Sequence, residues 1–196
     1  IEKLFVDTYP VGKAFGVIHV NENGHTFEIA TFRSDSGTSD GRRPDAVLFS
    51  HAEDDAQRRD FTINALFYDP IADEMHDFIG GQDDIGNKLI RFIGDPHQRI
   101  LEDHLRILRA IRFKNTLGFN YHPDTYAALK KHAPLADKVS WERVRDELNK
   151  IIMAHSAPVA FEDMQDTGVL PYVLPELEAC KGLAQPMEFH QEGDVW

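Results

Sequence analysis

Residues 95–119 read DPHQRILEDHLRILRAIRFKNTLGF, and they combine a regular apolar pattern with many charges. Asp95 is a good N-cap residue, Pro96 suits the first position of a helix, and Gly118 is typical of the position just beyond a helix end. No Gly or Pro lies between Pro96 and Gly118. The sequence therefore predicts one continuous helix in this stretch.

The predicted helix has an apolar side and a charged side. At about 100° per residue, the apolar residues fall on one broad arc that must face a core, and these are Ile100, Leu101, Leu105, Ile107, Leu108 and Ile111. The opposite arc holds Arg99, Glu102, Asp103, Arg106 and Arg109. Arg112 lies at the edge of the apolar arc and needs a partner, because an unpaired buried charge is costly. Taken alone, the pattern also fits an amphipathic helix with a solvated charged face.

Composition restricts the class of protein. The chain has 196 residues, of which 42% are hydrophobic, which is enough for one large or two small cores. Its formal net charge of -12 makes it a poor general binder of nucleic acid, so any RNA contact needs a local basic patch. The single cysteine, Cys180, excludes an internal disulfide and predicts a reducing, cytoplasmic location. No apolar run is long enough to span a membrane, and we expect no membrane partner.

The N-terminal part alternates short strand patterns with turns. Asn23-Gly24 is a strong hairpin signal between a β-rich run at Phe15–Val20 and a return strand at Thr26–Phe32. On the return strand, Glu28 is a carboxylate among apolar neighbours. Two readings stay open for it: an edge-strand charge that faces water, or a metal-binding and catalytic carboxylate.

Further elements follow from periodicity and turn residues. Arg33–Asp45 has no periodicity and predicts a flexible surface loop. We expect strands near 46–49, 66–68, 75–79 and 89–93, and short helices near 53–58 and 82–87. Longer helices are predicted near 123–132, 140–153 and 158–167, with a short helical turn in 170–177. The layout is α+β: a mixed part with strands, followed by an all-helical part from about Asp95.

A polar nonamer at Arg58–Leu66, RRDFTINAL, carries donors suited to phosphate and ribose oxygens. Taken alone, it could also be a helix edge with a salt bridge. The common phosphate loops, GxGxxG and GK[ST], are absent from the sequence, as are the zinc motifs HExxH and CxxC.

Three blocks in this order carry a resemblance to a known family. They are Arg58–Leu66, then Gly80-Gly81-Gln82-Asp83-Asp84, then Gly94–Phe113 with its Glu102-Asp103 pair and its arginines. Together they resemble the class II tRNA nucleotidyltransferases, which are CCA-adding enzymes, and their relatives the bacterial poly(A) polymerases. The segment Glu142–Leu148 resembles a further motif of that family.

The resemblance implies a fold and an activity. The fold would be a polymerase β-like nucleotidyltransferase head with a mixed sheet and helices at 1–94, followed by a helical neck at 95–154 and the start of a helical body at 155–196. The family uses Mg²⁺ and nucleoside triphosphates to extend an RNA 3′ end. The expected function is template-independent addition of C and A to the tRNA 3′ end from CTP and ATP. The alternatives are a poly(A) polymerase or A-adding enzyme, and an inactive relative that binds nucleotide or RNA.

Residue roles are carried over from the same resemblance. Nucleotide-binding candidates are Arg59, Asp60, Asn64, Asp103, Arg106, Arg109 and Arg112, with Asp103 and Arg106 as the pair that reads the base. Glu28 would be the catalytic and metal-binding carboxylate of the head. Residues 33–45 would match a mobile loop needed for A addition, and 189–196 resemble the opening of an HD-type segment.

The proposed base readers could select C and A over U and G by the order of hydrogen-bond donor and acceptor. As neighbours three residues apart on one helix, Asp103 and Arg106 can converge on one spot, where Asp accepts and Arg donates hydrogen bonds. Cytosine and adenine each present an amino donor beside a ring nitrogen acceptor, whereas uracil and guanine present the reverse order. The alternative is that Asp103 and Arg106 merely pair with each other on the helix surface.

One family feature has no match. The Gly-Gly turn and the two metal-binding aspartates that open the family pattern are not found, and Asp7 is isolated. The chain begins with Ile1 and ends at Trp196 within a pattern, so we expect part of a longer protein. Because one carboxylate cannot hold two Mg²⁺ ions, we expect these residues alone to be inactive.

Overall fold

The computed structural model describes residues 1–10, 16–36, 46–185 and 188. The chain divides into two compact units, Ile1–Arg58 and Arg59–Trp196, and each is described by itself. This division falls before the 94/95 boundary expected from the sequence pattern, because residues 59–94 share a core with the helices. The predicted segments 1–94, 95–154 and 155–196 therefore stay a prediction about functional domains.

The first unit consists of short strands and one helix. Strands β1 (Thr8–Tyr9), β2 (Val17–Glu22) and β3 (His25–Ala30) form an antiparallel sheet in that order. Asn23 and Gly24 both have positive φ, 51° and 77°, which confirms the predicted hairpin turn. Strand β4 (Arg33–Ser36) pairs with β5 (Ala46–Phe49), and α1 (Ala52–Gln57) follows.

The predicted loop at 33–45 is wrong for its first four residues, which form β4. The start of β4 is held by α1 and its C-cap residue. The Arg33 backbone N–H donates to Asp55 Oδ1 at 3.2 Å, and the Arg33 carbonyl accepts from Arg58 Nε at 3.2 Å. These partners lie more than twenty residues away, so the polar local sequence does not reveal them. The remainder of the predicted loop, 37–45, lies outside the described residues.

The second unit begins with a hairpin and a short helix. A 3-10 turn at Thr62–Asn64 leads into β6 (Leu66–Asp69), which pairs with β7 (Glu74–Asp77). Helix α2 (Gly81–Gly86) and strand β8 (Leu89–Ile90) follow. Strand β8 pairs in parallel with β9 (Asn120–Tyr121) and thereby joins this region to the helices.

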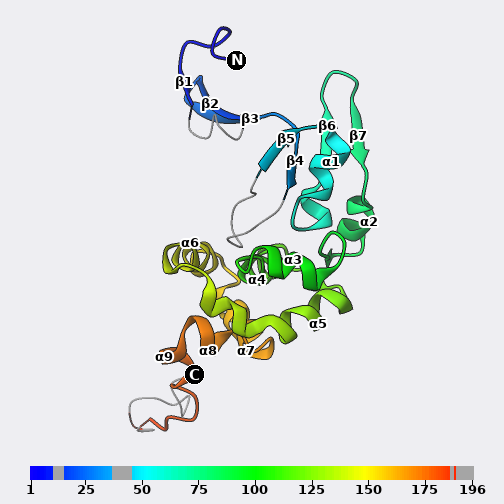
Figure 1. The fold of residues 1–196 in the computed structure, drawn as a ribbon. Coiled ribbons are helices and arrows are strands. Elements are labelled where there is room, and N and C mark those ends of the chain that lie inside the picture. Colours follow the sequence, from blue (N-terminus) through cyan, green and yellow to red (C-terminus); the bar gives the residue numbers. More distant parts are fainter. Residues whose placement is uncertain (11–15, 37–45, 186–187, 189–196) are drawn as a thin grey trace. The chain divides into compact units, whose positions relative to one another are not determined.

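Helices form the rest of the second unit (Figure 1). In chain order the structure contains α3 (Pro96–Glu102), α4 (Arg106–Leu117), α5 (Pro123–His132), a 3-10 segment (Ala133–Lys138), α6 (Trp141–Ile152), α7 (Ala157–Asp166), α8 (Leu170–Val173) and α9 (Pro175–Glu178). The three longer helices predicted after Gly118 are therefore confirmed, within one residue at each end.

The single helix predicted for 96–117 is wrong, because the structure contains two. Its ends are as expected: Asp95 accepts a hydrogen bond from the His97 backbone at 2.9 Å, and Gly118 follows the last turn with φ 65°. Between them Asp103 is extended, at φ -151° and ψ 107°, and its Oδ1 accepts from the Leu105 backbone at 3.1 Å. An Asp side chain that bonds the backbone two residues on competes with helical hydrogen bonding.

The hydrophobic core surrounds α4. Helix α4 packs against α6 and α7, and α3 packs against α5 (Figure 1). Phe61 and Phe92 are buried and stack with ring centroids 4.8 Å apart, so the segment after α1 is part of this core. Of the predicted apolar arc, Leu101 is exposed, while the other five residues are buried. Within the described residues, no helix is both long and apolar enough to cross a membrane.

Candidate functional site

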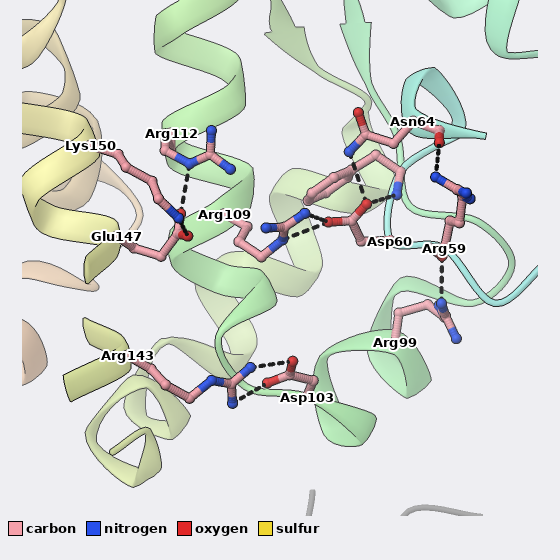
Figure 2. Close-up of polar contacts among 11 residues, drawn as sticks. Arg59, Asp60, Asn64, Arg99, Asp103, Arg109, Arg112, Arg143, Glu147 and Lys150 are labelled. Atoms are coloured by element: carbon pink, nitrogen blue, oxygen red, sulfur yellow. Dashed lines mark hydrogen bonds and ion pairs between the residues drawn. The ribbon is translucent and has the colours of Figure 1, made fainter. Parts of the chain in front are cut away.

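Asp60 lies at the centre of a buried polar cluster that joins the nonamer to α4. Its Oδ1 accepts from the Phe61 backbone and from Asn64 Nδ2, both at 2.9 Å, and its Oδ2 contacts Nε and Nη2 of Arg109 at 2.6 Å (Figure 2). A carboxylate has roughly four acceptor positions, and these contacts use them. Asp60 therefore fixes Asn64 and Arg109 in place.

Arg59 and Arg99 lie next to each other on the side of this cluster. Arg59 Nη1 donates to the Asn64 carbonyl at 3.1 Å, and its guanidinium carbon lies 5.2 Å from the centroid of the Phe67 ring. Arg99 in turn donates to the Arg59 carbonyl (Figure 2). The Arg99 guanidinium thus contacts the Arg59 backbone, while the Arg59 guanidinium contacts the Asn64 backbone. Each guanidinium is a group that suits an anionic ligand such as a phosphate.

The Gly80-Gly81 block supports the turn that carries Asn64. A Cβ on Gly81 would lie 2.4 Å from the Thr62 carbonyl oxygen, so only glycine permits this close approach. Thr62 Oγ1 donates to Asp84 Oδ2 at 2.7 Å, and Arg91 Nε donates to the same oxygen at 2.9 Å. The block therefore fixes the nonamer through backbone and side-chain contacts.

Asp77 completes the support at the start of α2. Its carboxylate accepts from four successive backbone N–H groups, those of residues 79–82, at 2.9 to 3.1 Å. Burial raises the pKa of Asp77, but these hydrogen bonds outweigh burial, and the net pKa lies below the ordinary value of 3.8. Reasoning from the sequence missed Asp77, because its role depends on how the chain folds back on itself.

Arg106 is held by α3 instead of by Asp103. Arg106 Nη1 donates to Glu102 Oε2 at 2.7 Å and to the Arg99 carbonyl at 2.6 Å, and Arg99 Nη1 donates to the same Glu102 oxygen. Glu102 therefore aligns two arginines. The alternative that Asp103 and Arg106 pair with each other is wrong, because each is paired elsewhere.

Asp103 pairs with Arg143 from α6. Arg143 Nη1 lies 3.0 Å from Asp103 Oδ1, and Nη2 lies 2.7 Å from Oδ2, which is a bidentate arrangement (Figure 2). The two side chains are 24% and 20% exposed, so the pair is partly open to solvent. Asp103 lies between two helices and Arg106 begins α4, so the expectation that they share one face of a continuous helix is wrong. The two residues are instead adjacent at the α3–α4 break, where the Arg106 N–H donates to the Asp103 carbonyl at 3.1 Å.

Arg112 has the partner that its position requires. Its Nε donates to Glu147 Oε2 at 2.6 Å, and Lys150 Nζ donates to Oε1 at 2.7 Å. The guanidinium also lies 4.1 Å from the Phe113 ring centroid. Burial raises the pKa of Glu147, but the hydrogen bonds and charges of Lys150 and Arg112 outweigh burial and bring the net pKa below the ordinary 4.5.

Glu28 lies in the other compact unit, on β3 at the edge of the described sheet. Its side chain is 65% exposed, and Oε2 lies 3.8 Å from Nε2 of His19 on the neighbouring strand. This geometry agrees with the open reading of an edge-strand charge. The catalytic and metal-binding role of Glu28 stays a prediction.

The described residues do not supply a metal site. Among them, no group of three or more His, Cys, Asp or Glu side chains is placed to hold a metal ion. Mg²⁺ prefers several oxygen ligands in octahedral geometry, and the exposed Glu28 alone does not fit this requirement.

Comparison with known proteins shows to which family the chain belongs. Residues 1–91 match the poly(A) polymerase head domain, and residues 118–181 match a domain described as the probable RNA and SrmB-binding site of polymerase A. A CCA-adding enzyme of Bacillus velezensis is 40% identical over 188 residues, which is 95% of this chain and 46% of that protein. The chain belongs to the tRNA nucleotidyltransferase and poly(A) polymerase family.

Solved structures of this family have the same fold. The CCA-adding enzyme of Bacillus stearothermophilus in complex with CTP matches with a TM-score of 0.78 at 34% identity, over 87% of this chain and 41% of that one. A tRNA nucleotidyltransferase complexed with a primer tRNA and an incoming ATP analogue matches with a TM-score of 0.73 at 25% identity, over 95% of this chain and 50% of that one. The α+β fold with a nucleotidyltransferase head is therefore confirmed, and the chain spans about half the length of the relatives it matches.

Proposed function

We propose that the complete protein adds C and A to the 3′ end of tRNA, using CTP and ATP without a nucleic acid template. The observation that carries the proposal is the pair of oppositely charged side chains at the α3–α4 break. Asp103 is held by Arg143, and Arg106 is held by Glu102, so an acceptor and a donor each have an external support. Family membership and the CTP complex of a relative agree with this function.

The pair would read the base by hydrogen-bond order. Asp103 accepts the exocyclic amino group that cytosine and adenine share, and Arg106 donates to the adjacent ring nitrogen. Uracil and guanine would place acceptor against acceptor and donor against donor. Each unsatisfied buried group costs roughly 1–3 kcal/mol, which rejects the wrong base.

The remaining candidates divide into contacts and supports. We assign Arg59 and Asn64 to the triphosphate and ribose, with Arg59 as the charged contact. Asp60 and Arg109 hold each other, and we assign them to positioning Asn64 and α4. Arg112 follows Arg109 by three residues on α4, and its partner there is Glu147. Mg²⁺ stays a prediction from the family, with Glu28 as the one ligand predicted in this chain.

A poly(A) or A-only polymerase is the second candidate, because the head-domain match carries that description. The two candidates differ in substrate. A CCA-adding enzyme requires a tRNA that lacks its CCA end and incorporates C before A, whereas a poly(A) polymerase extends a generic RNA with ATP alone. The proposed substrates also imply a cytoplasmic protein.

The test is incorporation of all four nucleotides by the complete protein into tRNA lacking CCA. In Asp103→Ala the preference for CTP and ATP over UTP and GTP should fall about tenfold, as expected for the loss of one base-reading hydrogen bond. In Arg59→Ala the KM for all four triphosphates should rise alike. The isolated 196-residue chain is the negative control and should show no incorporation. Full preference for CTP and ATP in Asp103→Ala would refute the base-reading role.

A further inference from the structure

The carboxylate of Asp103 is nearly saturated with hydrogen bonds. Among the described residues, Oδ1 accepts from the Leu105 backbone at 3.1 Å and from Arg143 Nη1 at 3.0 Å, while Oδ2 accepts from Arg143 Nη2 at 2.7 Å. Of roughly four acceptor positions on a carboxylate, these bonds use three. The capacity that remains is for one further donor, on Oδ2.

A second ion pair of α6 helps to fix the position of Arg143, and in this pair α6 supplies the acidic residue instead of the basic one. Arg143 and Glu147 are one turn apart on α6, so they lie on the same face. Arg143 reaches the acidic Asp103, and Glu147 reaches the basic Arg112 of α4 (Figure 2). A rotation or shift of α6 by one turn would place like charges together, and the two pairs therefore fix the register of α6 against the α3–α4 break.

Asp103 depends on this fixed helix because it lies between α3 and α4, at φ -151° and ψ 107°. Its backbone carbonyl accepts from the Arg106 N–H at 3.1 Å, but this bond does not fix the plane of the carboxylate. A planar guanidinium bonded to both carboxylate oxygens fixes the carboxylate plane as well as its position. A lysine could form only a point contact.

We infer that Arg143 is a specificity-determining positioning residue, which holds Asp103 so that one acceptor position on Oδ2 is offered to the exocyclic amino group of the nucleobase. The inference rests on the proposed function, and it adds α6 to the base-reading apparatus. Arg143 acts through Asp103 and touches no substrate. It also balances the charge of Asp103, so that selection depends on hydrogen-bond geometry instead of attraction for any donor.

The consequence is a defined kinetic signature. Without Arg143, the Asp103 carboxylate can rotate and present both oxygens, or turn toward Arg106. The ratio of kcat/KM for CTP to that for UTP should then fall roughly tenfold, because a fixed charge-assisted pair is lost. A merely structural role would lower kcat/KM for all four nucleotides by the same factor and leave the ratio unchanged.

The experiment compares three variants of the complete protein on tRNA lacking CCA. Arg143→Ala removes the pair, and Arg143→Lys keeps the charge but loses the bidentate contact. Arg145→Ala is the matched control, since Arg145 lies on the same helix, is 59% exposed, and pairs only with the exposed neighbour Asp146 among the described residues. The ratio of two nucleotides in one preparation does not depend on the fraction of folded protein.

Each outcome decides one question. A lowered ratio in Arg143→Ala, an intermediate ratio in Arg143→Lys and an unchanged ratio in Arg145→Ala support the inference. An unchanged ratio in both Arg143 variants overturns it, while a selective wild type leaves the proposed function standing. A wild type without selectivity for CTP and ATP refutes the proposed function first. If Arg143→Ala fails to fold, Arg143→Lys alone is decisive. A fall of about threefold in its CTP-to-UTP ratio supports the inference, and an unchanged ratio overturns it.

Discussion

The two compact units differ in how much core they contain. Every member of the hydrophobic core cluster lies in 59–196, around α4. Among the described residues of the first unit, only Val20 and Ala56 are buried hydrophobics, while Leu4, Val6 and Phe49 are largely exposed. The first unit is therefore a set of strands with little core, and the second is a packed domain.

The same difference applies to the candidate site residues. The seven predicted nucleotide-binding residues lie in the packed unit, where each has a defined ion pair or hydrogen bond. Glu28 lies in the unit with little core, and its one described contact is a 3.8 Å approach to His19. Side chains that read a ligand need rigid support, and among the described residues the packed unit supplies it, around α2, α3, α4 and α6.

Separating the two units should give the largest difference in thermal unfolding. We expect residues 59–185 alone to unfold in one cooperative thermal transition, because they contain the whole core cluster. Residues 1–58 alone should show no transition, since burial of a few apolar side chains cannot offset the loss of chain entropy. Circular dichroism against temperature measures both. A cooperative transition in 1–58 would contradict the comparison.

Removing one carboxylate from each unit should give a smaller, graded effect. Glu147→Ala leaves the guanidinium of Arg112 buried without its partner, and the free energy of unfolding should fall by about 3–5 kcal/mol. Glu28→Ala removes an exposed edge-strand charge, and the change should stay within about 0.5 kcal/mol. Urea denaturation of the complete protein compares the two. Equal losses would mean that the first unit is supported as firmly as the second.

A histidine pair between α3 and α5 should give the smallest effect, a pH dependence. His97 Nδ1 and His132 Nε2 lie 3.1 Å apart. The pKa of His132 lies below the ordinary value of 6.5, chiefly because of burial and then because of the charges of His97, Lys131 and His104. The charge of Asp95 acts in the opposite direction and raises this pKa. A lowered folded pKa means that the unfolded state takes up the proton first, so stability is retained above pH 6.5 and lost as pH falls below it.

The measurement is the free energy of unfolding between pH 6.5 and about pH 5, by urea denaturation. His132→Gln should flatten this pH dependence, whereas the exposed His155→Gln should leave it unchanged. If His132→Gln loses stability with pH as steeply as the wild type, the pair has no part in the acid sensitivity of the packed unit.

Local sequence determined several turns and helix ends. The Asn23-Gly24 turn, the N-cap at Asp95 and the glycine at 118 all have the predicted geometry, because each depends on the φ and ψ of one or two residues. The sequence also predicted that Arg112 requires a partner, since a charge at the edge of an apolar arc cannot stay unpaired. The family and its fold followed from three ordered motifs.

Tertiary structure alone decided the ion-pair partners, and it acted together with a local hydrogen bond at the helix break. Arg143 meets Asp103 from 40 residues away, and Glu147 meets Arg112 from 35, distances over which no periodicity carries information. The apolar pattern continues through 96–117, yet the helix breaks at Asp103, because the carboxylate bonds the Leu105 backbone and the guanidinium of α6. Helical propensity is worth less than about 1 kcal/mol per residue, and a bidentate ion pair from a distant helix outweighs it.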